Sequence, residues 1–285
     1  MDLSPCSLET DWAGFNRLVF VYHALQTRRA AGVATPLRVS GWVEGNLCAA
    51  IAVVLARHAV GGPAADWVVE DDAVALHWRR NGFGGEFGLT PRPDAYETAI
   101  PFRRFAQGET RAASAYLSEY FRPGTRGLPD MTERLLEQFR VQLLEVVQNA
   151  SDHAEAEAGV YSCGQYFPHK HLMLYTIADT GIGFAERARR SLGERSAPEE
   201  AVSRALAGRS TKRGVVPGGC GLQIIREFAR LNQGRLIVVS DAAYWEEGPD
   251  GVKVDRLQSP FPGTAVTLEV RTDDRCVYAL SDELE

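Results

Sequence analysis

The sequence lacks the features that mark a disulfide scaffold, a membrane protein or a nucleic-acid binder. Its five cysteines are scattered and form no Cys-x-x-Cys pair, which argues against a disulfide framework and a structural zinc site. No uncharged apolar run approaches the roughly 18 residues that cross a bilayer. The formal net charge is -6, so there is no basic excess that would favour nucleic acid or an anionic membrane as a partner.

The sequence also predicts the cellular compartment and the number of domains. The first residues lack the basic and then apolar layout of a signal peptide, so together with the unpaired cysteines they predict a cytoplasmic protein. An apolar fraction of 45% and a charged fraction of 24% are ordinary for a globular chain. At 285 residues the chain exceeds the usual size of one domain, so two domains are expected.

Residues 1–121 have the pattern of a small α/β domain. Helical spacing of apolar residues predicts helices, and alternation predicts a short strand, a hairpin and an extended segment. The predicted elements are helices over 12–31, 46–59 and 110–121, a strand over 35–41, a hairpin of 66–70 with 73–80, a loop over 81–88 and an extended segment over 97–105. This arrangement resembles the STAS-like domains found beside bacterial switch kinases. Residues 122–130 carry two prolines and two glycines and are the predicted linker.

A long amphipathic helix is predicted over residues 131–153. Asp130 and Glu133 have the spacing of a capping box at its start. Apolar residues at three- and four-residue spacing define the face expected to meet the core, namely Leu136, Phe139, Leu143, Val147 and Ala150. This helix opens the predicted second domain, residues 131–272. Residues 273–285 are expected to form a C-terminal tail.

A polar stripe runs along another face of the same helix. Glu145, Asn149 and His153 follow one another at four-residue spacing, inside the apolar run "LLEVVQNASDHA". An idle polar stripe is costly to bury, whereas Asn149 offers an oxygen to Mg²⁺ and Glu145 can take a proton from an attacking water or hydroxyl. A solvated helix face is the alternative explanation of this spacing.

A first glycine turn follows the predicted strand over residues 171–179. Asp179 ends this strand, and Gly181 and Gly183 permit a flat ligand to approach the main chain closely. A buried carboxylate needs a donor, and the exocyclic amine of adenine is a suitable one. The alternative is a plain strand-to-helix turn in which Asp179 caps the helix over residues 184–192.

A second glycine stretch opens another predicted helix. Residues 208–217, including Thr211 and Lys212, form a connection of the length expected for a lid. Gly219 and Gly221 then lead into a helix on which Leu222 faces inward, and the unpaired N–H groups of such a helix start suit phosphate oxygens. The spacing matches neither the P-loop nor the Rossmann fingerprint. Three strands over 235–240, 252–257 and 264–270 complete an α+β arrangement with one layer of helices on a mixed or antiparallel sheet.

In this order, residues 130–272 resemble the GHKL superfamily of ATP-binding domains, which gyrase, heat-shock chaperone ATPases, histidine kinases and mismatch-repair ATPases share. "LLEVVQNASDHA" resembles the family's N box, "DTGIGF" and "GGCGLQII" resemble its glycine boxes, and "GTAVTLEV" resembles its closing strand. The resemblance implies a Bergerat-type two-layer α/β sandwich that binds Mg²⁺ and ATP. We assign no role to "GQYFP", residues 164–168.

The resemblance also implies roles for individual residues. Asn149 is expected to coordinate Mg²⁺, and Glu145 to act as a general base or to position water. The expected nucleotide-binding set comprises Asp179 at the adenine amine, Gly181 and Gly183 in the pocket, Gly219 and Gly221 at the phosphates, Leu222 directly after them, Thr264 near adenine, and Thr211 and Lys212 in the lid.

The expected function is that of a regulatory ATPase, or of a kinase of the anti-sigma switch type. Such a protein hydrolyses ATP or transfers its γ-phosphate to a protein partner, and homodimerisation is compatible with either activity. The alternative is a non-catalytic switch in which bound ATP orders the lid. Neither nucleic acid nor a membrane is an expected partner.

Overall fold

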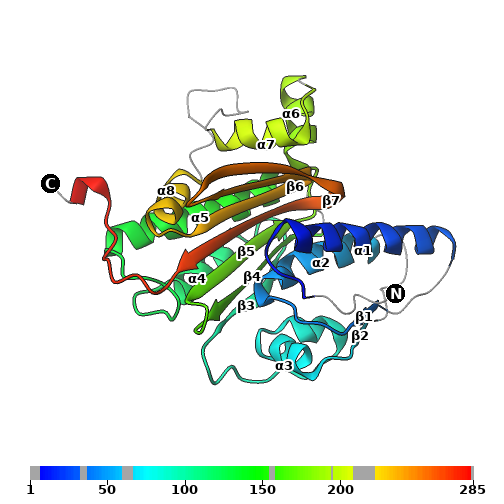
Figure 1. The fold of residues 1–285 in the computed structure, drawn as a ribbon, viewed down its shortest axis with the longest axis horizontal. Helices are drawn as coiled ribbons and strands as arrows, with labels where there is room; N and C mark the ends of the chain where they lie inside the picture. The colour runs from blue at the N-terminus through cyan, green and yellow to red at the C-terminus, as the bar shows by residue number, and fades with distance from the viewer. Residues whose placement is uncertain are drawn as a thin grey trace.

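The computed structural model describes residues 7–32, 37–59, 67–153, 158–193, 195–207 and 222–283. Within these ranges the chain is an α+β protein with eight α-helices and a five-stranded antiparallel sheet (Figure 1). None of the described helices is both long and apolar enough to cross a membrane.

The large sheet has the strand order β3-β4-β5-β7-β6, and every neighbouring pair is antiparallel. Its strands are β3 (Ala99–Phe105), β4 (Val160–Phe167), β5 (Leu172–Asp179), β6 (Arg235–Gly248) and β7 (Gly251–Arg271). The prediction of three C-terminal strands is wrong, because residues 252–257 and 264–270 belong to the single strand β7. Register shifts between Ser240 and Ala243 of β6 interrupt the pairing at the point where the sequence suggested a break.

One face of the sheet carries the long predicted helix of residues 131–153 together with three others. These are α4 (Thr110–Tyr120), α5 (Glu133–His153), α7 (Pro198–Leu206) and α8 (Gln223–Leu231), which share one hydrophobic cluster with the sheet. The predicted core face of α5 is confirmed, since Leu136, Phe139, Leu143, Val147 and Ala150 are all buried. On β5, Met173, Tyr175 and Ile177 alternate toward this side.

The opposite face is covered as well, so the expectation of one layer of helices is incomplete. Helices α1 (Trp12–Ala30) and α2 (Cys48–Ala59) lie against it (Figure 1) and share a second hydrophobic cluster with the sheet. Ala178, Val239 and Ala265 contribute the small and apolar side chains on this face. Because the central strands are apolar on both sides, a single helical layer would leave half of that surface in water.

The predicted boundary at residues 122–130 does not separate two cores in the described structure. Strand β3 precedes this segment but pairs with β4, which follows it. Phe121, at the end of α4, lies against Phe139 of α5, with ring centroids 5.9 Å apart. The remaining N-terminal strands, β1 (Leu37–Val39) and β2 (Trp67–Val69), form only a short parallel pair. Of the described part of residues 1–121, most therefore packs on the large sheet.

The predicted hairpin of residues 66–70 with 73–80 is wrong in its second half, which is the helix α3 (Asp72–Arg80). Asp71 caps this helix, because its Oδ1 accepts hydrogen bonds from the N–H groups of Ala73 at 2.8 Å and Val74 at 3.1 Å. Val74 and Trp78 lie one turn apart and are buried. The cap and this buried pair favour a helix over the strand that the short alternation suggested. Residues 83–87 form a 3₁₀ turn where a loop was expected.

The start of α5 also differs from the prediction. Thr132, not Asp130, caps it, since its Oγ1 accepts the N–H of Leu135 at 3.2 Å. The same hydroxyl donates to Glu283 Oε2 at 2.7 Å, and the backbone of Tyr278 pairs with residues on either side of Met131. The described part of the predicted C-terminal tail is therefore fastened to the start of α5.

The "GQYFP" segment acquires a packing role. Gln165 Oε1 accepts the N–H of Gly45 at 2.7 Å, which holds the approach to α2 against β4. At Gly164 a Cβ would lie 2.9 Å from Ile100 Cδ1 and 2.9 Å from the Leu174 carbonyl oxygen. This segment therefore joins the N-terminal layer to the sheet.

Candidate functional site

The candidate site centres on Asp179, the last residue of β5. Its backbone pairs with Val160 on one side and Thr264 on the other, and the residue is only 6% exposed. Strand alternation places this side chain on the same face as Ile177, the face that α5 covers. The predicted position of Asp179 at the end of a strand is confirmed.

Burial disfavours the charged form of the Asp179 carboxyl group. Burial raises the pKa of Asp179 to about 7, although a hydrogen bond from Gly181 N–H to Oδ1 at 2.7 Å and the charge of Arg57 both act to lower it. That bond is the only one that the described residues give this side chain. The second carboxylate oxygen therefore has unused capacity to accept a hydrogen bond.

Asp179 does not cap the helix that follows, so the plain-turn alternative fails in that respect. Helix α6 (Gly183–Leu192) begins after Ile182, and no side chain caps it. The Asp179 side chain bonds instead within its own turn, at Gly181. One carboxylate oxygen therefore supports the turn locally, and the other has no partner among the described residues.

Gly183 and two hydroxyl groups shape the wall beside Asp179. Gly183 has φ of 76°, and a Cβ there would lie 3.0 Å from Ser240 Oγ. Ser240 Oγ accepts the N–H of Phe184 at 3.1 Å and shares a hydrogen bond of 3.0 Å with Thr264 Oγ1. The start of α6 is therefore seated on β6 and β7, and the structure brings the predicted residues Asp179, Gly181, Gly183 and Thr264 to one end of the sheet.

Thr180 and Gly263 belong to this end of the sheet, and sequence reasoning assigned them no role. The Thr180 hydroxyl is buried, and in the described structure it has no hydrogen-bond partner. Gly263 lies so close to the end of β5 that a Cβ there would be 1.9 Å from the Asp179 carbonyl oxygen. Both residues lie inside the quoted motifs, "DTGIGF" and "GTAVTLEV", and that is the only signal that pointed to them.

The polar stripe of α5 is less enclosed. Glu145 is half-buried and Asn149 is exposed, and neither has a hydrogen bond to any described residue. Both lie off the buried face of α5, so a cost of burial does not account for Asn149, whose exposure also fits a solvated helix face. The side chain of His153 lies outside the described residues. The magnesium and base roles of Asn149 and Glu145 stay predictions.

Gln142 is a further residue that sequence reasoning missed. It is buried on α5, and its Oε1 accepts the N–H groups of Ile224 at 3.0 Å and Ile225 at 3.2 Å. These N–H groups belong to the first turn of α8, where helical partners are lacking. Glutamine is not a common capping residue, so its identity gave no hint of a contact with a distant helix.

Several predicted ligands lie outside the described residues. These are Thr211, Lys212, Gly219 and Gly221, and their roles stay predictions. Leu222 is described, is half-buried and packs against the α5 side of the core, as expected for an inward-facing residue. Within the described residues no group of three or more His, Cys, Asp and Glu side chains is placed to hold a metal ion.

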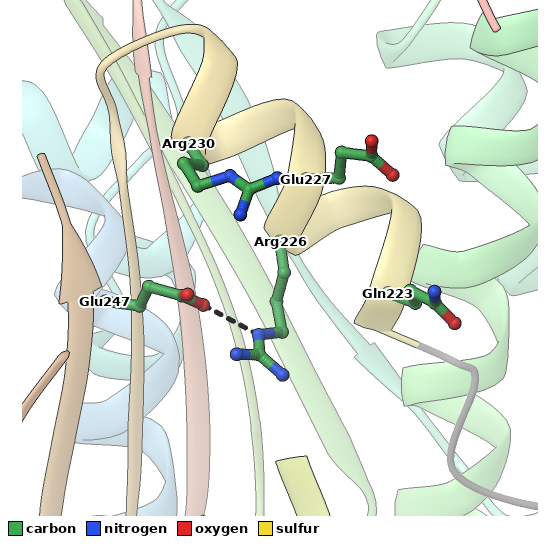
Figure 2. Close-up of a pocket in the computed structure, with 5 residues that line it drawn as sticks. All are labelled: Gln223, Arg226, Glu227, Arg230 and Glu247. Atoms are coloured by element: carbon green, nitrogen blue, oxygen red, sulfur yellow. Dashed lines mark hydrogen bonds and ion pairs between the residues drawn. The ribbon is translucent and has the colours of Figure 1, made fainter. Parts of the chain in front are cut away.

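A surface hollow lies apart from Asp179, on the outer side of α8. Gln223, Arg226, Glu227, Arg230 and Glu247 line it. Figure 2 shows Arg226 directed toward Glu247, whose Oε2 accepts from Arg226 Nε at 2.7 Å, while Gln223 and Glu227 point elsewhere. The Arg226 guanidinium also lies 5.3 Å from the centre of the Trp245 ring. Because its inner arginine is already neutralised, we do not assign a nucleotide to this hollow.

Comparison of the chain with models of known protein families and with curated proteins gave no match.

Proposed function

We propose that this protein binds Mg²⁺ and ATP at the Asp179 end of the sheet, and that it hydrolyses the ATP or transfers its γ-phosphate to a protein partner. The observation that carries the proposal is the buried Asp179 carboxylate, with one oxygen bonded to Gly181 and the other without a donor among the described residues. Retaining such a group costs stability, and a ligand that donates a hydrogen bond offsets the cost.

Adenine fits this carboxylate better than guanine. The exocyclic amine of adenine donates, whereas guanine carries a carbonyl oxygen at the corresponding ring position, and two acceptors would then face each other. The unpartnered Thr180 hydroxyl adds a donor and acceptor at the same end of the sheet. Gly181 and Gly183 add no side chains to this wall, and a Cβ at Gly183 would already lie 3.0 Å from Ser240 Oγ.

The phosphate end of the proposed site depends on α5 and α8. Asn149 supplies an oxygen that would help to hold Mg²⁺, which neutralises phosphate charge when it is bound. Glu145 lies one turn earlier on α5, so the two side chains start roughly 6 Å apart. From there Glu145 can take the proton of the attacking water or acceptor hydroxyl. Gln142 keeps the start of α8, the proposed phosphate end, beside this helix.

A second candidate function is a non-catalytic switch, and the Gln142 contact favours it. Phosphates bound near the start of α8 would compete for, or rearrange around, the N–H groups that Gln142 now occupies. A rearrangement of the start of α8 would reach α5 through the Gln142 side chain, and this would not require ATP hydrolysis.

The test is to incubate the purified full chain with Mg²⁺ and γ-labelled ATP, alone and with cell extract. Label on a protein supports phosphate transfer, free phosphate supports hydrolysis, and binding without either supports the switch. Absence of ATP binding refutes the proposal. Equal affinity for ATP and GTP contradicts the role of Asp179.

Variants of α5 divide the proposed roles. Asn149→Ala is expected to abolish Mg²⁺-dependent binding, while Gln148→Ala, a neighbour on the same helix, serves as the matched control. Glu145→Ala is expected to bind ATP but to lose turnover, and unchanged turnover would exclude the base role.

In our proposal the protein is cytoplasmic, works with a protein partner or phospho-acceptor, and is compatible with a homodimer.

A further inference from the structure

Arg57 is the charged residue from the N-terminal layer that acts on the candidate site. It lies in the last turn of α2, on the sheet face opposite α5, and its side chain is half-buried. Its Nε donates a hydrogen bond of 3.2 Å to the carbonyl oxygen of Pro262, in β7. Among the charged groups around Asp179, Arg57 is the one whose charge acts on that carboxylate.

The β7 backbone that Arg57 holds is not fixed by strand pairing. Phe261 pairs with Asp241 and Thr264 pairs with Ser240, so the two residues between Phe261 and Thr264 have no partners on β6. Pro262 has no N–H group to give to a neighbouring strand. The bond from Arg57 to its carbonyl therefore substitutes for a missing ladder contact.

This stretch lies directly against the end of β5. Gly263 approaches so closely that a Cβ would lie 1.9 Å from the Asp179 carbonyl oxygen and 3.2 Å from Thr180 Cα. A shift of Pro262 and Gly263 would consequently move the turn that carries the Asp179 carboxylate. Arg57 is thus connected to Asp179 in two ways, through the β7 backbone and through its charge.

We propose that Arg57 is a positioning residue for the adenine end of the site, where it fixes Pro262 and Gly263 beside β5. Its positive charge also favours the ionised form of Asp179. The ionised carboxylate accepts hydrogen bonds with both oxygens, whereas the protonated acid would present a donor to the adenine amine. This inference rests on the proposed function, because it concerns the same carboxylate. It gives the N-terminal layer a role in nucleotide recognition.

The other groups near Asp179 are neutral or act elsewhere. Ser240 from β6, Thr264 from β7 and Gly183 from α6 carry no charge. Asp241 is the second carboxylate at this end, and a Cβ at Gly183 would lie 3.8 Å from its Cβ. Burial raises the pKa of Asp241, and its charged neighbours are Arg256 and Glu199. A titration must therefore be assigned by subtraction of the Asp179→Asn spectrum.

The experiment compares the ligand-free and ATP-bound titrations of four variants of the full chain. Arg57→Gln and Arg57→Met remove the charge, and Arg57→Lys keeps it. Arg29→Gln is the matched control, because Arg29 also donates to a backbone carbonyl, that of His58 at 2.7 Å, but does not act on Asp179. The readouts are the ¹³C shift of the Asp179 carboxyl and the Kd for Mg²⁺ and ATP, both between about pH 5 and pH 9.

We expect Arg57→Gln and Arg57→Met to raise the Asp179 midpoint by about half a pH unit and to weaken ATP binding about threefold near neutrality. Arg57→Lys and Arg29→Gln are expected to keep the wild-type midpoint. An unchanged midpoint in both neutral variants, or an equal shift in Arg29→Gln, overturns the inference. Because the titration needs no ligand, it still tests Arg57 if wild-type protein fails to bind ATP, a result that refutes the proposed function alone.

Discussion

Replacing Asp179 with asparagine should stabilise the ligand-free protein while weakening its affinity for ATP. The folded-state pKa of about 7 lies well above the ordinary value of 3.8, because burial penalises the charged form. The folded protein therefore binds a proton more tightly than the unfolded chain does. Wild-type stability falls as the pH rises from about 4 to about 7, and the full cost of the buried charge is present above that window.

The expected gain in the free energy of unfolding follows from the difference between the folded-state and ordinary pKa of Asp179. Roughly three pKa units correspond to at most about 4 kcal/mol, and relaxation of the site reduces this to an expected gain of about 1 to 3 kcal/mol at pH 8. Asparagine has the same shape, carries no charge, and its Oδ1 can still accept the Gly181 N–H. For a chain of this size the gain corresponds to about 2 °C in Tm per kcal/mol.

The assay is urea unfolding of wild type and Asp179→Asn at pH 8, pH 6 and about pH 4.5, followed by circular dichroism. The difference between the two proteins should be largest at pH 8 and should nearly vanish at the lowest pH. Asp250→Asn, at the exposed β6–β7 turn, is the control and should show no such trend. The reasoning is refuted if Asp179→Asn is no more stable than wild type at pH 8. In the same protein, ATP affinity should fall about tenfold or more, since a charged acceptor is lost.

The remaining predictions concern residues that support the site. Gln142→Ala should lower the free energy of unfolding by about 1 to 3 kcal/mol by leaving N–H groups of α8 without an acceptor, as urea unfolding would show. Gln142→Glu should retain stability but weaken ATP binding in calorimetry, because its charge competes with phosphate at the helix start. Gly263→Ala should cost about 3 kcal/mol or more through its clash with the Asp179 backbone, whereas Gly85→Ala, with open space around it, should leave Tm nearly unchanged. Thr132→Val should cost about 1 kcal/mol by removing the cap of α5, and an unchanged Tm would contradict that assignment.

The errors of sequence reasoning have local causes. Alternation over residues 73–80 suggested a strand, but Asp71 as a cap and the buried pair Val74 and Trp78 favour a helix. Asp130 matched a capping pattern in the sequence, but α5 begins at Glu133, and it is Thr132 whose Oγ1 accepts the Leu135 N–H. In both cases two local signals competed, and the contacts of the folded chain decided between them.

The sequence by itself determined the features that depend on neighbouring residues. Helical periodicity marked the buried face of α5, alternation marked β5, and the glycines after Asp179 marked the turn that the structure contains. The order of these segments was enough for a resemblance to an ATP-binding family and for the candidate residues Glu145, Asn149 and Asp179.

Only the tertiary structure decided how distant segments combine. It placed β3 in the large sheet, covered the second face with α1 and α2, and set Arg57 and Gln142 against parts of the candidate site that lie far along the chain. Such contacts form because apolar surface on both sides of the sheet must be buried and every buried N–H needs an acceptor. Those requirements act on the whole folded chain, and no local pattern of residues records which partners satisfy them.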